Sequence, residues 1–182
     1  SGYSAARAGR ARRDGMETVQ GMAGEILLER DGDIATVVLS APERLNAMNL
    51  AMWQGIADAF AALDAEEDLR CIVIRGAGDK AFAAGADIAE FERERHDVES
   101  AARYGAAMAA ALDNTSRCRH PIVALIKGAC VGGGLELVSC VGLRIFGRSR
   151  LFGVPVKILV LVVARNEMQA VAGLVGRAVA LE

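Results

Sequence analysis

Short apolar segments alternate with helical stretches along most of this chain, and this alternation limits the fold more than any other feature. Two apolar-rich segments, Glu25–Arg30 and Ile34–Leu39, are joined by Asp31-Gly32, a dipeptide that suits the positive φ angles of a tight turn. They predict a β-hairpin. Further strands are predicted at residues 71–75, 122–126 and 143–146.

The stretches between these strands show the periodicity of helices. Asn49 is suited to cap a helix, because apolar residues follow it at spacings of three and four. The residues expected on this buried stripe are Trp53, Ile56, Phe60 and Leu63. A second helix is predicted at residues 98–117, and others at 135–140 and 166–181. The apolar residues that recur at steps of four in the second helix are Tyr104, Met108 and Leu112. Strands that alternate with helices predict an α/β layered fold.

The composition describes one globular domain. Of the 182 residues, 53% are hydrophobic and 24% charged, so the chain can build a core without disulfides or metals. The net charge of -2 provides no global field to attract phosphate backbones, and we expect no nucleic-acid binding. The apolar stretch Ile122–Leu143 is interrupted by Lys127 and Glu136, so we expect no transmembrane helix and no membrane partner.

Cysteine and histidine, which often build metal or catalytic sites, are scarce here. The four cysteines form no CxxC pair and are expected to be small buried residues of a reducing compartment. The only histidines are His96 and His120, and Cys118 with His120 lacks two further ligands at zinc spacing, so no metal is expected. No G-x-S-x-G turn presents a serine, which argues against a Ser-His-Asp hydrolase.

Residues 1–24 differ from the rest of the chain. Arginines lie among small residues, with no acid before Asp14 and no apolar run typical of a secretory signal. A transit peptide is compatible with this composition, but a flexible leader or an expression remnant is the preferred interpretation. We therefore predict a flexible segment 1–24, a folded core 25–182 and a cytoplasmic location.

Two glycine-bearing loops each follow a predicted strand. Gly85-Ala-Asp87 lies in the loop expected at 81–88, and Gly132-Gly-Gly134 precedes a helix; neither matches G-x-G-x-x-G or G-x-x-x-x-G-K-[ST]. Loops of this kind offer backbone N–H groups to a ligand oxygen, and two converging donors form an oxyanion hole. Close packing of a strand against a helix is the commoner reason for such glycines, and both explanations stay open.

Glu136 interrupts the apolar pattern directly after these glycines. Glutamate is rarely buried without a reason. The residue is either an acid favoured by the positive end of a helix dipole or a general acid/base beside an oxyanion pocket. The residues alone do not decide between the two.

Three motifs occur in register: RLNAMN at Arg44–Asn49, AFAAGADI at Ala81–Ile88 and GACVGGGLEL at Gly128–Leu137. Together they resemble the enoyl-CoA hydratase/isomerase family, the crotonases, from about Glu25 to the end of the chain. The resemblance implies a spiral of ββα units with C-terminal helices for trimer contacts. We expect that helical part to be absent from this chain, and the resemblance implies a homotrimer or a dimer of trimers.

The resemblance also implies roles for single residues. The backbone N–H groups of Ala86 and Gly133 would hold the thioester carbonyl of an acyl-CoA as it becomes an enolate. Glu136 matches the family's first catalytic glutamate, which in hydratases activates water. The positions that match the CoA-gripping residues are Leu45, Ala47, Ala84, Asp87 and Ile88. Asp87 alternatively caps the following helix. CoA is part of the substrate, so no separate cofactor is implied.

One departure from the family pattern bears on the reaction. Hydratases usually place a second glutamate after the proline of F-G-x-P-E, and here Pro155 is followed by Val156. Syn hydration needs a base for water and an acid for the α-carbon. The first hypothesis is a hydratase in which Glu136 alone acts on a 2-enoyl-CoA. The alternatives are another crotonase reaction (isomerase, hydrolase or decarboxylase) and an acyl-CoA-binding protein without efficient turnover.

Overall fold

The computed structural model describes residues 17–19, 24–87, 90 and 98–153. Its strands are β1 (Glu17–Val19), β2 (Glu25–Asp31), β3 (Ile34–Ser40), β4 (Cys71–Gly76), β5 (Ala81–Ala83), β6 (Ile122–Val131) and β7 (Leu143–Gly153). Its helices are the 3-10 turn η1 (Pro42–Arg44), α1 (Leu50–Asp64), α3 (Val98–Arg117) and α4 (Gly133–Ser139). The alternation of strands and helices confirms the predicted α/β class.

The sheet begins antiparallel and then becomes parallel. β1, β2 and β3 are antiparallel neighbours, β4 joins β3 in parallel, and β6 joins β4 in parallel. β5 and β7 both pair with β6, also in parallel. The predicted hairpin is confirmed, with Gly32 in its turn at φ 61°. β1 lies within the segment 1–24 that we expected to be a leader, and this part of it joins the sheet.

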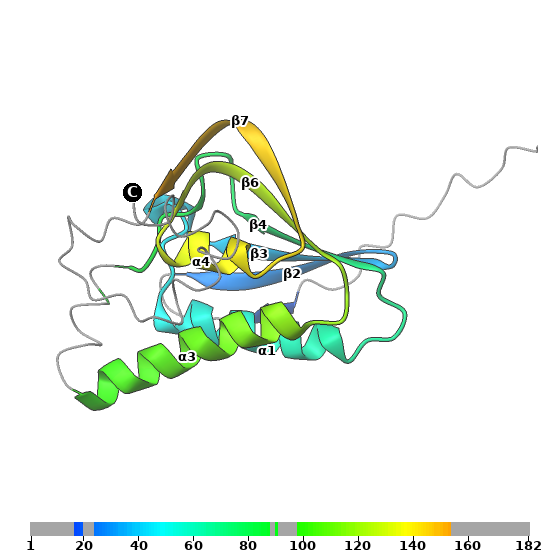
Figure 1. Cartoon of the computed structure of the whole chain (residues 1–182), viewed down its shortest axis with the longest axis horizontal. Coiled ribbons are helices and arrows are strands. Elements are labelled where there is room, and N and C mark those ends of the chain that lie inside the picture. Colours follow the sequence, from blue (N-terminus) through cyan, green and yellow to red (C-terminus); the bar gives the residue numbers. More distant parts are fainter. Residues whose placement is uncertain (1–16, 20–23, 88–89, 91–97, 154–182) are drawn as a thin grey trace, which may run out of the picture.

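Helix α1 packs against β2 and β3, and α3 lies along α1 (Figure 1). Asn49 caps α1 as predicted, because its Oδ1 accepts a hydrogen bond from the Met52 N–H at 2.8 Å. The predicted stripe on α1 is fully buried in the core. At Gly55 the helix approaches β2 so closely that a Cβ would lie 3.0 Å from Ile26 Cγ1. Among the helices that the structure describes, none combines the length and the apolar character needed to cross a membrane.

Strand β6 bends at Gly128, and the bend directs the chain toward α4. Gly128 has φ 63°, and a Cβ there would overlap the Lys80 carbonyl oxygen, so no side chain fits. The Ala129 N–H donates to the same carbonyl at 3.1 Å. Before the bend β6 pairs with β4, and after it with β5. Figure 1 shows β6 and β7 arching together over α4.

Several elements extend further than predicted. The strands predicted at 122–126 and 143–146 continue as β6 and β7, because their mutual pairing resumes after the irregularity at Gly128. Ala81–Ala83, expected to be part of a loop, form β5, because the second half of β6 offers a parallel partner. Sequence periodicity could not reveal this pairing. The helix predicted at 166–181 and the position Val156 lie outside the described residues.

The turn before α1 is held by the side chain of Asn46. Leu45 and Asn46 both have left-handed backbone angles, with φ 52° and 55°. The Asn46 side-chain oxygen accepts from the Ala41 N–H at 3.0 Å, and its Nδ2 donates to the carbonyls of Ala77 at 3.0 Å and Ala81 at 2.8 Å. The single buried side chain of Asn46 therefore joins the turn to Ala77, which follows β4, and to Ala81, where β5 begins.

We predict that Asn46→Gly lowers the free energy of unfolding by about 3 kcal/mol, because buried backbone groups lose their partners while glycine still tolerates the backbone angle. Asn114→Ala is the matched control, since Asn114 makes a single bond, from Nδ2 to the Ala57 carbonyl at 2.8 Å. It should cost about 1 kcal/mol. Urea unfolding measures both variants. Equal losses would contradict the proposed role of Asn46.

Candidate active site

A short parallel pairing between Met48 and Ala86 brings the first two sequence motifs together. The Met48 N–H donates to the Gly85 carbonyl at 2.7 Å, and the Met48 carbonyl accepts from the Asp87 N–H at 3.0 Å. Both bonds go to the residues that flank Ala86. Because successive residues of an extended strand direct their backbone groups to opposite sides, the Ala86 N–H faces away from Met48.

Glycines bring this segment against the start of α4. A Cβ on Gly132 would lie 3.6 Å from the Gly85 Cα, an ordinary van der Waals distance, so the two backbones are neighbours with room for a Cβ between them. A Cβ on Gly133 would lie 2.7 Å from Trp53 Cζ2, closer than any side chain tolerates. The close-packing explanation is therefore confirmed for Gly133. Ala86 and Gly133 directly follow the neighbouring glycines Gly85 and Gly132.

The first turn of α4 leaves two backbone donors available. The N–H groups of Leu135 and Glu136 both donate to the Gly132 carbonyl, at 2.9 and 3.1 Å. Within residues 24–87, 90 and 98–153, the N–H groups of Gly133 and Gly134 make no backbone hydrogen bond. Gly133 is half-buried, so its donor is sheltered from bulk water.

Glu136 is buried, with only 5% of the residue exposed. It lies three positions after Gly133 on α4, and residues at this spacing share one face of a helix. A carboxylate that only complements a helix dipole has no need of burial, so its position favours the second interpretation, an acid/base beside the glycine loop. Its catalytic role stays a prediction.

The four cysteines are free thiols, and Cys130 is buried, whereas the other three are half-buried. Burial raises the pKa of the Cys130 thiol to about 12. Burial also raises the pKa of Cys140, and the nearby negative charge of Glu136 raises it further, against a smaller opposing effect of Arg144. In the part of the chain that the structure describes, no three histidine, cysteine or acidic side chains are grouped as metal ligands.

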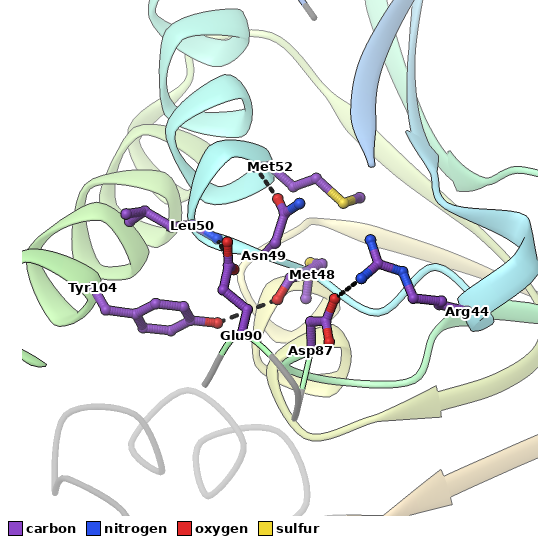
Figure 2. A network of polar contacts seen from close by, with 8 residues as sticks. All are labelled: Arg44, Met48, Asn49, Leu50, Met52, Asp87, Glu90 and Tyr104. Carbon is purple, nitrogen blue, oxygen red and sulfur yellow. Dashed lines mark hydrogen bonds and ion pairs between the residues drawn. The ribbon is translucent and has the colours of Figure 1, made fainter. Parts of the chain in front are cut away.

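Ionic contacts anchor the loop that carries Ala86 (Figure 2). The Asp87 carboxylate is buried and forms an ion pair with Arg44. Glu90 Oε2 accepts from the Leu50 N–H at 2.7 Å, so this carboxylate adds a second cap to α1 beside Asn49. The Asp87 side chain is thus committed to a contact within the protein. Glu90, in the helix that Asp87 was expected to cap, donates its N–H to the Asp87 backbone carbonyl at 3.2 Å, and the cap by the side chain stays a prediction.

The remaining positions carried over as CoA contacts surround the same turn. Leu45 is 42% exposed, and its carbonyl accepts from the Ala84 N–H at 3.0 Å. Ala47 and Ala84 are half-buried. Ile88 lies outside the described residues. The structure thus brings Leu45, Ala47 and Ala84 close to Ala86, and their contact with CoA stays a prediction.

Two buried aromatic residues form hydrogen bonds that the sequence analysis did not predict. Trp53 and Tyr104 were expected only as members of apolar stripes. In the structure, Trp53 Nε1 donates to the Tyr104 hydroxyl at 3.0 Å, and that hydroxyl donates to the Met48 carbonyl at 3.2 Å. The one available signal was chemical: a buried indole N–H and a buried phenol each need a partner.

Comparisons with known proteins identify the family of this chain. Residues 29–182 match the sequence model of a family described as enoyl-CoA hydratase/isomerase. The chain is 33% identical to the crotonyl-CoA hydratase of Syntrophomonas wolfei over 130 residues. The aligned part is 71% of this chain and 49% of that protein. It is 29% identical over 163 residues to a peroxisomal Delta(3,5)-Delta(2,4)-dienoyl-CoA isomerase of Arabidopsis thaliana, with coverages of 84% and 58%. The chain spans about half the length of these curated relatives.

Solved structures show the same fold. A crystal structure described as an enoyl-CoA hydratase/carnithine racemase from Magnetospirillum magneticum matches with a TM-score of 0.83 at 42% identity, over 91% of this chain and 61% of that chain. An enoyl-CoA hydratase from Thermoplasma volcanium matches with a TM-score of 0.77 at 37% identity, over 88% and 62%. The resemblance of the three motifs is thereby confirmed, and the chain belongs to the enoyl-CoA hydratase/isomerase family.

Proposed function

We propose that this chain carries the acyl-CoA site of a hydratase-type enzyme, which adds water across the double bond of a 2-enoyl-CoA. One observation supports the proposal most directly: Gly85 and Gly132 are neighbours, and the residue after each, Ala86 or Gly133, has an N–H group that makes no backbone hydrogen bond within the described residues. The buried carboxylate of Glu136 lies one helical turn beyond Gly133. The names of relatives, which include both hydratases and an isomerase, support an acyl-CoA substrate.

The proposed chemistry follows from these groups. Glu136 accepts a proton from water while the water oxygen bonds to the β-carbon of the substrate, and the electron pair of the double bond moves toward the thioester oxygen. The N–H groups of Ala86 and Gly133 stabilise the resulting enolate oxygen, a contribution of about 10² to 10³ in rate for one such donor. Protonated Glu136 then returns its proton to the α-carbon, so no second carboxylate is needed.

A protein that binds acyl-CoA without efficient turnover is the second candidate. Val156 occupies the position of the family's second glutamate. This favours the binding protein, because a single carboxylate would have to serve as both base and acid in hydration. Both candidates place the thioester in the same oxyanion hole, and neither involves a cofactor apart from the CoA of the substrate. The trimeric assembly implied by the resemblance is a further proposal that rests on analogy.

Glu136→Gln tests the hydratase. The amide keeps the shape of the side chain but cannot take a proton from water, so we expect turnover of a 2-enoyl-CoA to fall by about 10² or more while acyl-CoA affinity is retained. Loss of the conjugated thioester absorbance measures turnover, and calorimetry measures affinity.

The control for this substitution is Glu66→Gln, which makes the same chemical change in an exposed ion pair with Arg30. We expect parent turnover in the control. Parent turnover in Glu136→Gln would exclude this residue as the acid/base. Binding without any product in the parent chain would select the second candidate.

The charge state of Glu136 can be tested through Cys140. Because the negative charge of Glu136 raises the pKa of the Cys140 thiol, Glu136→Gln should lower that pKa. More thiolate is then present at a given pH, and alkylation of Cys140 should become faster between about pH 7 and pH 10. Peptide mass spectrometry follows the reaction at single cysteines.

Cys130 is the internal reference for this experiment, because burial alone raises its pKa to about 12. Its alkylation should remain slow in both proteins. An unchanged pH profile for Cys140 in Glu136→Gln would show that position 136 carries no charge close to this thiol.

A further inference from the structure

We propose that Tyr104 is a positioning residue for the oxyanion hole, and that it fixes the Ala86 donor through Met48 and the Gly133 donor through Trp53. The inference rests on the proposed function, since it concerns the geometry of the same two N–H groups. Tyr104 lies on α3, outside the three sequence motifs that carry the family resemblance.

The first half of this link runs through the Met48 backbone. The Tyr104 hydroxyl donates to the Met48 carbonyl at 3.2 Å, as Figure 2 shows. The same carbonyl accepts from the Asp87 N–H at 3.0 Å, and the Met48 N–H donates to the Gly85 carbonyl. Tyr104 therefore fixes the residue whose two backbone bonds hold Ala86 on both sides.

The second half runs through the indole ring of Trp53. Trp53 Nε1 donates to the Tyr104 hydroxyl at 3.0 Å, and the neighbouring edge of the same ring packs against Gly133, where a Cβ would lie 2.7 Å from Cζ2. A shift or rotation of the ring would move it into or away from the first turn of α4. The hydrogen bond to Tyr104 fixes the ring, and the ring supports Gly133.

The chemistry of the three groups fixes the direction of every hydrogen bond. An indole N–H can only donate and a carbonyl can only accept, so the phenol must accept from Trp53 and donate to Met48. Phenylalanine would fill the same space but can do neither. Exposures of 4% for Tyr104, 1% for Trp53 and 0% for Met48 leave no room for water to replace the hydroxyl. A role in packing alone would not require this hydroxyl.

The test uses the full chain and a saturated ligand, butanoyl-CoA labelled with carbon-13 at the thioester carbonyl. This ligand has no double bond to hydrate, so its infrared carbonyl band reports the oxyanion hole whether or not the chain turns over substrate. Hydrogen bonds from Ala86 and Gly133 should lower the frequency of the bound carbonyl. Tyr104→Phe should reduce that displacement and broaden the band, and reduce kcat for a 2-enoyl-CoA about tenfold, with KM nearly unchanged.

Thr115→Val is the matched control. Thr115 is buried on the same helix, and its hydroxyl donates to the Ala111 carbonyl at 2.7 Å, away from Met48. Its loss should lower stability by a similar amount and leave the carbonyl band as in the parent. If Tyr104→Phe does not fold, Trp53→Phe answers the same question, because a smaller ring loses both the bond to Tyr104 and the contact with Gly133.

The outcomes separate the two proposals. A displaced band in the parent that is reduced in Tyr104→Phe but retained in Thr115→Val supports the positioning role. A band displaced equally in the parent and in Tyr104→Phe, or in Trp53→Phe where that variant is used, overturns it and leaves the proposed function intact. A carbonyl band that binding does not displace in the parent overturns the oxyanion hole itself, and the positioning role with it.

Discussion

Two backbone hydrogen bonds of Met48 hold the segment Gly85–Asp87 against the turn before α1, and the candidate site depends on them. This pairing directs the Ala86 N–H away from Met48. The pairing also depends on the shape of the turn before α1, which Asn46 stabilises through three hydrogen bonds. The candidate oxyanion hole is therefore made of backbone groups, and the Asn46 side chain keeps part of that backbone in place.

Local chemistry made part of this fold predictable. The hairpin at Asp31-Gly32 and the Asn49 cap of α1 depend on residues close together in sequence, and both are confirmed. The existence of β5 depends on a partner more than forty residues away, and it was predicted as loop. Periodicity identifies an element from the pattern of apolar and polar residues within that element. It therefore cannot predict a strand that forms because another strand bends at Gly128.

The candidate site was likewise predictable only in part. The motifs indicated Ala86, Gly133 and Glu136, and the structure adds that the first two follow neighbouring glycines and that Glu136 is buried. Tyr104 and Trp53 gave only a pattern typical of core residues. Their hydrogen bonds join α1, α3 and the turn at Met48, and a contact among three separate elements leaves no signature in any one of them.

The contact between Gly133 and Trp53 restricts how the sequence of this chain can change over time. While the indole ring occupies its present place, a side chain at position 133 would overlap it, so a substitution there requires the ring to shift or position 53 to become smaller. Either change alters the hydrogen bond from Trp53 to Tyr104. Positions 53, 104 and 133 are therefore expected to vary together among homologous sequences rather than independently.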